Sequence, residues 1–218
     1  MKRLILIPIL FLSVFSNAQD QDPKAKSILD EVSALVKGYK SIQADAVFTI
    51  VGKDKKVVDK PQAWKIQVKG QKFRLEIPGT SILSDGKTLW NYNKDAKEVT
   101  IKNFDPSSDE MNPAKIFTIY ESGYKYKYEK EEKIGPTACH VIALYPSVKP
   151  ERKKFHTAKI YIDKTKKQIV RMVMFMKDGG TQTYDIKAMK TNVEMPDNLF
   201  TFDTKGLKPD QINDERDL

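Results

Sequence analysis

The sequence predicts a mainly β protein: a curved antiparallel sheet of about ten or eleven strands with two short helices over its concave face. Three observations support this fold class. Apolar and polar side chains alternate along most of the chain, turn residues separate the alternating runs, and only two stretches show helical spacing. A sheet of that many strands must twist and curl, which leaves a concave face for helices to cover.

The amino terminus has the layout of a cleavable secretory signal. Lys2 and Arg3 precede an apolar run of about a dozen residues, which closes on small residues at Ser16 and Ala18. The run is shorter than the roughly 20 residues that span a bilayer. We therefore expect residues 1–18 to be removed after export and residues 19–218 to form a single domain. Because no cysteine follows the small residues, we expect no lipid anchor.

The first predicted helix covers residues 22–38. Asp22 and Pro23 are a typical pair for a helix N-cap and first turn, and Gly38 supplies a stop. Between them apolar residues recur at helical spacing. These residues are Ile28, Leu29, Val32, Leu35 and Val36. We expect this apolar stripe to pack on another element.

Strands are predicted wherever the alternation has period two. The clearest cases place on one face Phe48 and Ile50, then Trp64, Ile66 and Val68, and then Phe73, Leu75 and Ile77. Further strands are predicted at 89–92, 99–101, 124–128, 140–145, 159–163, 169–176, 182–189 and 199–202. Turn residues at 69–70, 78–79, 85–86 and 178–180 separate consecutive runs, so we expect hairpins in a meander.

A second helix is predicted over residues 112–123. Asn112 and Pro113 repeat the start signal, and Gly123 supplies the end signal. The apolar residues between them are Ile116, Phe117, Ile119 and Tyr120. This helix is short and unusually apolar for an exposed position, so we expect it to cover part of the sheet.

The sequence lacks the groups that common catalytic and metal sites need. His140 and His156 stand outside any metal-ligand spacing, and Cys139 is the only cysteine, so no internal disulfide can form. No phosphate-binding loop or nucleophile-elbow motif is present. The formal net charge is +9, but the lysines alternate with carboxylates, which indicates a solvated surface rather than nucleic-acid binding. We expect no metal, no cofactor and no enzymatic activity.

Met172, Met174 and Met176 lie on one face of the strand predicted at 169–176. Methionine is flexible and polarizable, so a stripe of it suits a surface that accepts apolar ligands of irregular shape. The same stripe is compatible with methionines that fill gaps in an ordinary core. The pattern leaves both interpretations open.

The segment S-D-G-K-T-L-W-N-Y at residues 84–92 resembles the most characteristic stretch of the LolA family of outer-membrane lipoprotein carriers. The resemblance continues through the apolar segment at 112–123 and the turn at 178–183 to L-F-T-F-D-T-K-G at 199–206. It implies an incomplete, unclosed antiparallel β-barrel of about eleven strands, covered by a helical lid over an apolar cavity.

The resemblance also implies a function and a site. Such a protein is a monomeric periplasmic carrier that takes acylated lipoproteins from an ATP-driven inner-membrane release complex to an outer-membrane acceptor. Many relatives carry Arg-Pro where this chain has Lys69-Gly70, so Lys69 is a possible latch for the lid. We expect the cavity and lid to be formed by Phe48, Ile50, Trp64, Ile66, Val68, Phe73, Leu75, Trp90, Tyr92, Ile116, Phe117, Tyr120, Met172, Met174 and Met176.

Two alternatives remain beside lipoprotein transport. One is a carrier of another acylated or polyene lipid for a dedicated pathway, which the same apolar cavity would serve. The other is a lipid-binding sensor of envelope stress, which usually needs a further domain. Because only a short segment follows Gly206 in this sequence, we expect no such domain.

Overall fold

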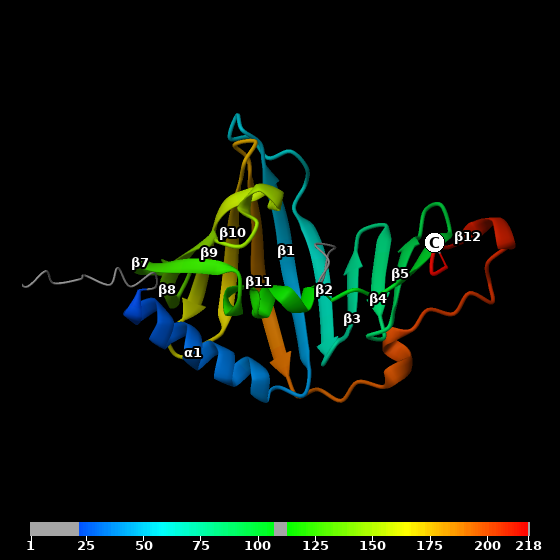
Figure 1. Cartoon of the computed structure of the whole chain (residues 1–218), viewed down its shortest axis with the longest axis horizontal. Coiled ribbons are helices and arrows are strands. Elements are labelled where there is room, and N and C mark those ends of the chain that lie inside the picture. Colours follow the sequence, from blue (N-terminus) through cyan, green and yellow to red (C-terminus); the bar gives the residue numbers. More distant parts are fainter. Residues whose placement is uncertain (1–21, 107–112, 218) are drawn as a thin grey trace, which may run out of the picture.

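A computed structural model describes residues 22–106 and 113–217 of the chain. The signal predicted at 1–18 and the predicted helix cap Asn112 lie outside these residues. Within the described part, one α-helix accompanies twelve strands that form a single curved, unclosed sheet (Figure 1). The predicted fold class is confirmed.

The strands divide the sheet into two meanders. They are β1 (Ile42–Val51), β2 (Gln62–Lys69), β3 (Lys72–Ile77), β4 (Thr80–Ser84), β5 (Thr88–Asn93), β6 (Glu98–Asn103), β7 (Tyr124–Ile134), β8 (Thr137–Pro146), β9 (Phe155–Asp163), β10 (Ile169–Met176), β11 (Thr181–Thr191) and β12 (Ile212–Asp214). The sheet order is β12-β6-β5-β4-β3-β2-β1-β11-β10-β9-β8-β7. Antiparallel pairing of β11 with β1 joins the two meanders. Among the described strands, only the short β12 pairs in parallel, and its partner is β6.

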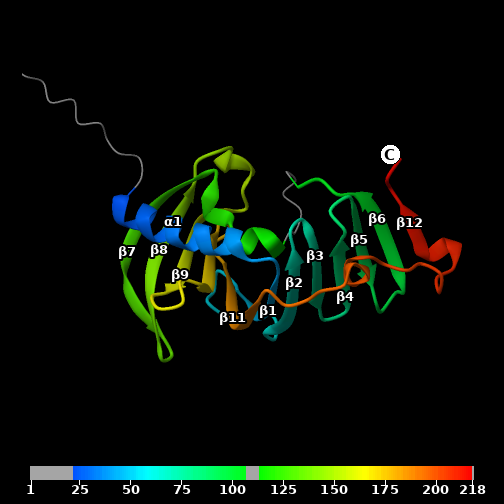
Figure 2. The same cartoon turned by 90° about the horizontal axis from the view of Figure 1, so that it is seen from below.

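The predicted first helix is present as α1 (Pro23–Gly38). The Asp22 side chain caps it by accepting hydrogen bonds from the backbone N–H groups of Lys24 and Ala25. Ile28, Leu29 and Val32 of its apolar stripe are buried in a cluster with side chains of β8, β9 and β10, and Val36 packs against that cluster. Leu35, predicted in the same stripe, is exposed. Figure 2 shows α1 lying across one face of the sheet. Within the described ranges, no helix has the length and apolarity needed to cross a membrane.

Asp22 also joins the helix to the sheet, because its other carboxylate oxygen accepts a hydrogen bond of 3.0 Å from the N–H of Tyr128 on β7. The N–H of Ala25, together with those of Tyr128 and Lys24, holds the pKa of the Asp22 carboxyl below its ordinary value. We predict that Asp22→Ala lowers the free energy of unfolding by about 1 kcal/mol at neutral pH, as loss of a helix cap does.

The charge-dependent part of this stabilisation has a defined direction with pH. A depressed folded-state pKa stabilises the protein above the unfolded-state pKa, and the effect is lost as the pH falls through the folded-state value. Urea unfolding of the wild type and of Asp22→Asn, which keeps a capping oxygen without the charge, measures it. We expect the difference between the two proteins to be largest above the unfolded-state pKa of the carboxyl and to disappear as the pH falls below its folded-state pKa; a difference independent of pH would contradict the assignment.

Two predicted elements differ from the structure, and two strands were not predicted. The segment expected as a helix at 112–123 forms two 3-10 turns in its described part, η1 (Pro113–Phe117) and η2 (Ile119–Glu121). The strand expected at 199–202 is replaced by a 3-10 turn, η4 (Asp197–Phe200), followed by extended chain. The sequence interpretation missed the strands β4 and β12. In the two predicted elements the local alternation or apolarity is present, but long-range packing determines the backbone conformation.

Two apolar clusters lie on the concave face and meet beneath η1. The first combines α1 with β8, β9 and β10, and the second combines β1, β2 and β3 with Phe117 of η1. Val36, Ile116 and Tyr184 pack against both clusters. Because the two clusters do not merge completely, the space between them is available for a cavity.

Candidate functional site

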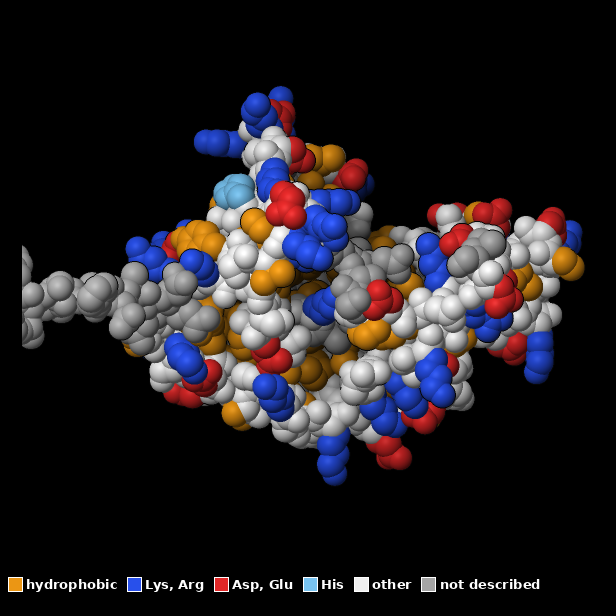
Figure 3. All heavy atoms as spheres, in the orientation of Figure 1, with side chains coloured by type: hydrophobic (Ala, Val, Ile, Leu, Met, Phe, Trp, Pro, Cys, Tyr) orange, Lys and Arg blue, Asp and Glu red, His pale blue; other side chains and the backbone are white. Residues whose placement is uncertain are grey.

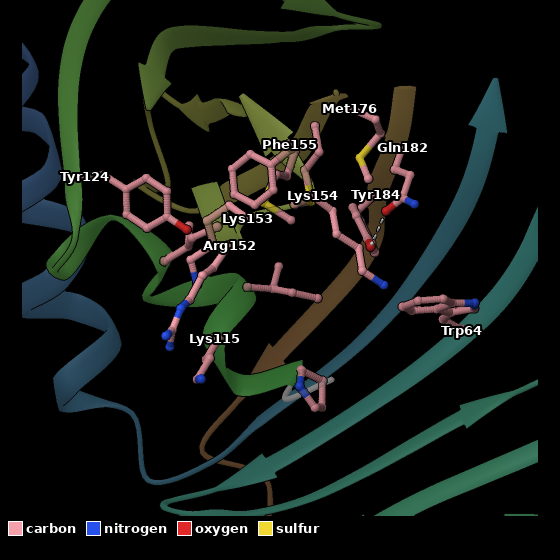
Figure 4. A pocket seen from close by; sticks show the side chains of 15 residues that line it. Trp64, Lys115, Tyr124, Arg152, Lys153, Lys154, Phe155, Met176, Gln182 and Tyr184 are labelled. Carbon is pink, nitrogen blue, oxygen red and sulfur yellow. Dashed lines mark hydrogen bonds between the residues drawn. The ribbon is translucent and has the colours of Figure 1, made fainter. Parts of the chain in front are cut away.

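A cavity of about 520 Å³ lies where the two apolar clusters meet. Its walls come from β2, β9, β10 and β11, its cover from η1 and η2, and its mouth from the loop between β8 and β9 (Figure 4). The lining residues are Trp64, Pro113, Lys115, Ile116, Ile119, Tyr124, Arg152, Lys153, Lys154, Phe155, Met172, Met174, Met176, Gln182 and Tyr184. Its size lies within the range of roughly 300–1,000 Å³ that is usual for small-molecule sites.

The methionine stripe forms one wall of the cavity. Since side chains alternate along β10, Met172, Met174 and Met176 all face the concave side, while Val173 and Phe175 face the other. Met172 is buried, whereas Met174 and Met176 are half-buried and border the open space. This wall is therefore apolar and able to change shape through its rotatable side chains.

Aromatic rings on β11, β1 and β2 continue this wall, with Tyr184 beside Met172 in the sheet register. Phe48 packs on Trp64 with ring centroids 4.6 Å apart, and Tyr184 contacts both rings at 4.8 and 5.5 Å. The Tyr184 hydroxyl donates a hydrogen bond of 3.4 Å to the side-chain oxygen of Gln182. Burial raises the pKa of Tyr184 to about 12, so its hydroxyl remains neutral at physiological pH. Tyr184 and Gln182 are thus polar but uncharged groups in a largely apolar wall.

The cover presents alternate side chains to the cavity and to the core. Ile116 and Ile119 line the cavity, while Phe117 and Tyr120 are 2% and 4% exposed within the apolar clusters. The Tyr120 hydroxyl is buried without a hydrogen-bond partner among the described residues, and burial raises its pKa. Phe117 and Tyr120 therefore hold the cover on the sheet, and the two isoleucines face the space beneath it.

Most of the predicted ligand residues lie at or beneath this cavity. Trp64, Ile116 and the three methionines line it directly. The others on the concave face belong to the clusters on which the cavity is built: Phe48, Ile50, Ile66, Val68, Phe73, Leu75, Phe117 and Tyr120. The sequence predicted that these side chains share the concave face. It did not show which of them border the cavity and which are packed in the core beneath it.

The expected positions of Trp90 and Tyr92 were wrong. In the register of the sheet, Trp90 stands opposite Leu83 and Tyr92 opposite Ser81, which places both on the face opposite to Phe73. Tyr92 there contacts Phe202, with ring centroids 4.8 Å apart. The carboxy-terminal segment covers this outer face, so β5 carries large apolar side chains on both of its faces. Alternation alone therefore could not show which of them face the cavity.

The expected contact of Lys69 with the lid is also wrong. Lys69 follows the inward-facing Val68, so its side chain points to the outer face. Its ammonium group donates hydrogen bonds to the backbone oxygen of Met195 at 2.8 Å and to Asp197 at 3.0 Å. Lys72 pairs with the same carboxylate at 2.9 Å. Lys69 therefore fastens the carboxy-terminal segment to the sheet and does not contact the cover.

Sequence interpretation missed the basic residues at the mouth of the cavity. Lys115 comes from η1, and Arg152, Lys153 and Lys154 come from the loop between β8 and β9. The run Arg152-Lys153-Lys154 is visible in the sequence, but runs of this kind usually form a solvated surface. Only the fold brings this run to the edge of an apolar cavity. In Figure 3, Lys and Arg side chains gather beside a hollow that exposes hydrophobic side chains.

The described residues offer little for catalysis or metal binding. No group of three or more His, Cys, Asp or Glu side chains that could hold a metal ion occurs in residues 22–106 and 113–217. The Cys139 thiol is buried, and burial raises its pKa, which disfavours the reactive thiolate. The described residues that line the cavity include no carboxylate. Its arrangement suits reversible binding of an apolar group.

A curved, unclosed antiparallel sheet with a helical cover over an apolar cavity defines the class of half-barrel binding proteins. Comparison with protein families then identifies the family. Residues 39–203 match the family model described as "Outer membrane lipoprotein carrier protein LolA", so the chain belongs to the LolA family.

The individual proteins that resemble this chain share less than a third of its residues. An uncharacterized protein of Methanocaldococcus jannaschii is 29% identical over 206 residues, which cover 92% of this chain and 58% of that protein. The chain thus spans about 58% of the length of this curated relative. Among solved structures, an uncharacterized conserved protein of Thermus thermophilus is 14% identical with a TM-score of 0.58, covering 88% of this chain and 99% of that one. The lipoprotein LppX of Mycobacterium tuberculosis is 15% identical with a TM-score of 0.49, over 81% and 99% of the two chains.

Proposed function

We propose that the chain is a periplasmic carrier that binds the acyl chains of lipoproteins in this cavity and shuttles them from the inner to the outer membrane. The observation that carries the proposal is the apolar cavity between the methionine wall of β10 and the cover, in a chain of the LolA family. In this role the protein performs no chemical step, and it works as a monomer.

The cavity accounts for binding through the hydrophobic effect. Removing an acyl chain from water gains about 0.8 kcal/mol for each buried CH₂ group. The half-buried Met174 and Met176 adapt their rotamers to the chain, and Ile116 and Ile119 of the cover complete the apolar surroundings.

A carrier must also release its cargo. Full burial of several acyl chains would make dissociation extremely slow, so a cavity that covers the chains only in part is an advantage. The cover consists of short 3-10 turns, which are less stable than a long α-helix. It is held by the buried side chains of Phe117 and Tyr120 and by Glu121, which accepts a hydrogen bond of 2.6 Å from Ser33 of α1. Movement of η1 and η2 away from the sheet opens the cavity for loading and unloading.

The proposed partners follow from this role. An ATP-driven release complex in the inner membrane loads the carrier, and an acceptor at the outer membrane receives the acylated protein. The secretory signal expected at 1–18 places the mature chain in the periplasm between them.

A transfer assay tests the proposal. Spheroplasts that have made a radiolabelled lipoprotein are incubated with the purified mature chain, and the label in the soluble fraction is measured before and after addition of outer-membrane vesicles. We expect the chain to release the lipoprotein into solution and to deliver it to the vesicles. Label that remains in the inner membrane would contradict the proposal.

A further inference from the structure

The mouth of the cavity is strongly asymmetric in charge. Among the described lining residues four are cationic, namely Lys115, Arg152, Lys153 and Lys154, and none is acidic. Within the described chain Lys159 stands beside Glu129 and Lys164 beside Glu131, whereas Arg152 and Lys154 have no carboxylate partner. A purely apolar cargo does not require this arrangement.

The loop that carries three of these cations is anchored by its backbone. The ammonium group of Lys177 donates hydrogen bonds to the backbone oxygens of Pro150 at 2.8 Å and Glu151 at 3.3 Å. The backbone N–H of Lys177 donates to the oxygen of Lys154 at 2.9 Å. These bonds occupy the loop's carbonyl groups and fix its position at the mouth.

The anchored loop leaves two exposed cations beside the cavity. Arg152 and Lys154 are exposed, and no ion pair or hydrogen bond of their side chains occurs within the part of the chain that the structure describes. Figure 4 shows Lys154 extending into the cavity toward Tyr184 and Gln182, while Arg152 extends on the same side as Lys115. Polar donors thus stand where the apolar space ends.

We propose that the cavity takes amphiphiles whose polar end is an anion, a carboxylate or a phosphate, with the acyl chain against the methionines and the anion at the basic mouth that Arg152 and Lys154 border. An anion cannot enter the apolar interior without a large desolvation penalty, so it remains at the mouth. There the guanidinium of Arg152 matches a carboxylate or phosphate with paired donors, and Lys154 offers a second positive charge nearer to Tyr184. This inference rests on the proposed binding of acyl chains and adds anionic amphiphiles to the ligands proposed above.

Three palmitoyl ligands that share one acyl chain test the inference: 1-palmitoyl lysophosphatidic acid, palmitate and uncharged 1-palmitoyl glycerol. Binding to the mature protein is followed by calorimetry and by tryptophan fluorescence, because Trp64 lines the cavity. At low salt we expect both anions to bind about tenfold more tightly than the glyceride, and the ratio to shrink in high salt because mobile ions screen exposed charges. A stronger preference for the phosphate or for the carboxylate identifies the source of the anion.

Matched variants separate this site from general charge. The double variant Arg152→Gln, Lys154→Gln removes two cations at the mouth. The control double variant Lys40→Gln, Lys190→Gln removes two exposed cations, just before β1 and near the end of β11. We expect the first pair to abolish the preference for the two anions over the glyceride, and the second pair to preserve it. Equal affinity of the wild type for all three ligands, or a preference retained without Arg152 and Lys154, would overturn the inference alone. Failure of all three ligands to bind would instead overturn the proposed function.

Discussion

Replacing Met174 with aspartate is expected to reduce the affinity for acyl chains by about 100-fold. Met174 is a half-buried member of the methionine wall and borders the cavity. A carboxylate at this position would place a charge against the acyl chain and would lose part of its hydration in a largely apolar wall. The desolvation cost of roughly 2–3 kcal/mol corresponds to a loss of that size.

Val173→Asp is the matched control for Met174→Asp. Val173 is the next residue of β10, is half-buried as well, and faces the outer side, where it stands opposite Lys159 in the sheet register. The same added charge there is close to a cation and far from the cavity. Calorimetry with a palmitoyl ligand should show normal affinity for Val173→Asp. Equal losses in both variants would mean that the strand, rather than the cavity wall, had been damaged.

The second large effect is expected from Phe117→Ala in the cover. Phe117 is 2% exposed, and η1 packs against β2 and β3. Truncating a buried phenylalanine costs about 3–5 kcal/mol. Because this side chain is a main anchor of the cover, we expect residues 113–121 to exchange amide hydrogens faster and the affinity for acyl chains to fall about tenfold.

Phe200→Ala provides the comparison for Phe117→Ala. Phe200 is fully buried in η4, which packs on β3 and belongs to the segment that covers the outer face. The same truncation there is expected to lower global stability to a similar degree without changing ligand affinity or exchange at 113–121. If the two variants lost affinity equally, the cover would have no specific role in binding.

The sequence was most informative where a signal is local. Asp22, Pro23 and the apolar spacing after them defined α1, and alternation with turns defined most strands. It was least informative about partners that are distant in the chain. Lys69 meets Met195, 126 positions away, and no local pattern indicates that contact.

In the candidate site, too, local features were predictable from the sequence and contacts between distant segments were not. Alternation placed the three methionines on one face, because parity within a strand is fixed by the backbone. Alternation could not decide which face of β5 lies on the same side of the sheet as the inward face of β3. The intervening strand β4 was missed, and β5 carries large apolar residues on both faces, with Leu89 inward and Trp90 outward. The basic run at 152–154 gained its significance only from the fold, which brings that loop to the cavity.

The central claim is that the cavity holds acyl chains, and mass spectrometry of the molecules that co-purify with the mature protein from its native cells tests it most directly. The wild type, Met174→Asp and Val173→Asp are purified in parallel. We expect acylated lipoproteins to co-purify with the wild type and with Val173→Asp, and to be absent from Met174→Asp. A wild-type protein that carries no acylated molecule, or a Met174→Asp protein that carries as much as the wild type, would contradict it.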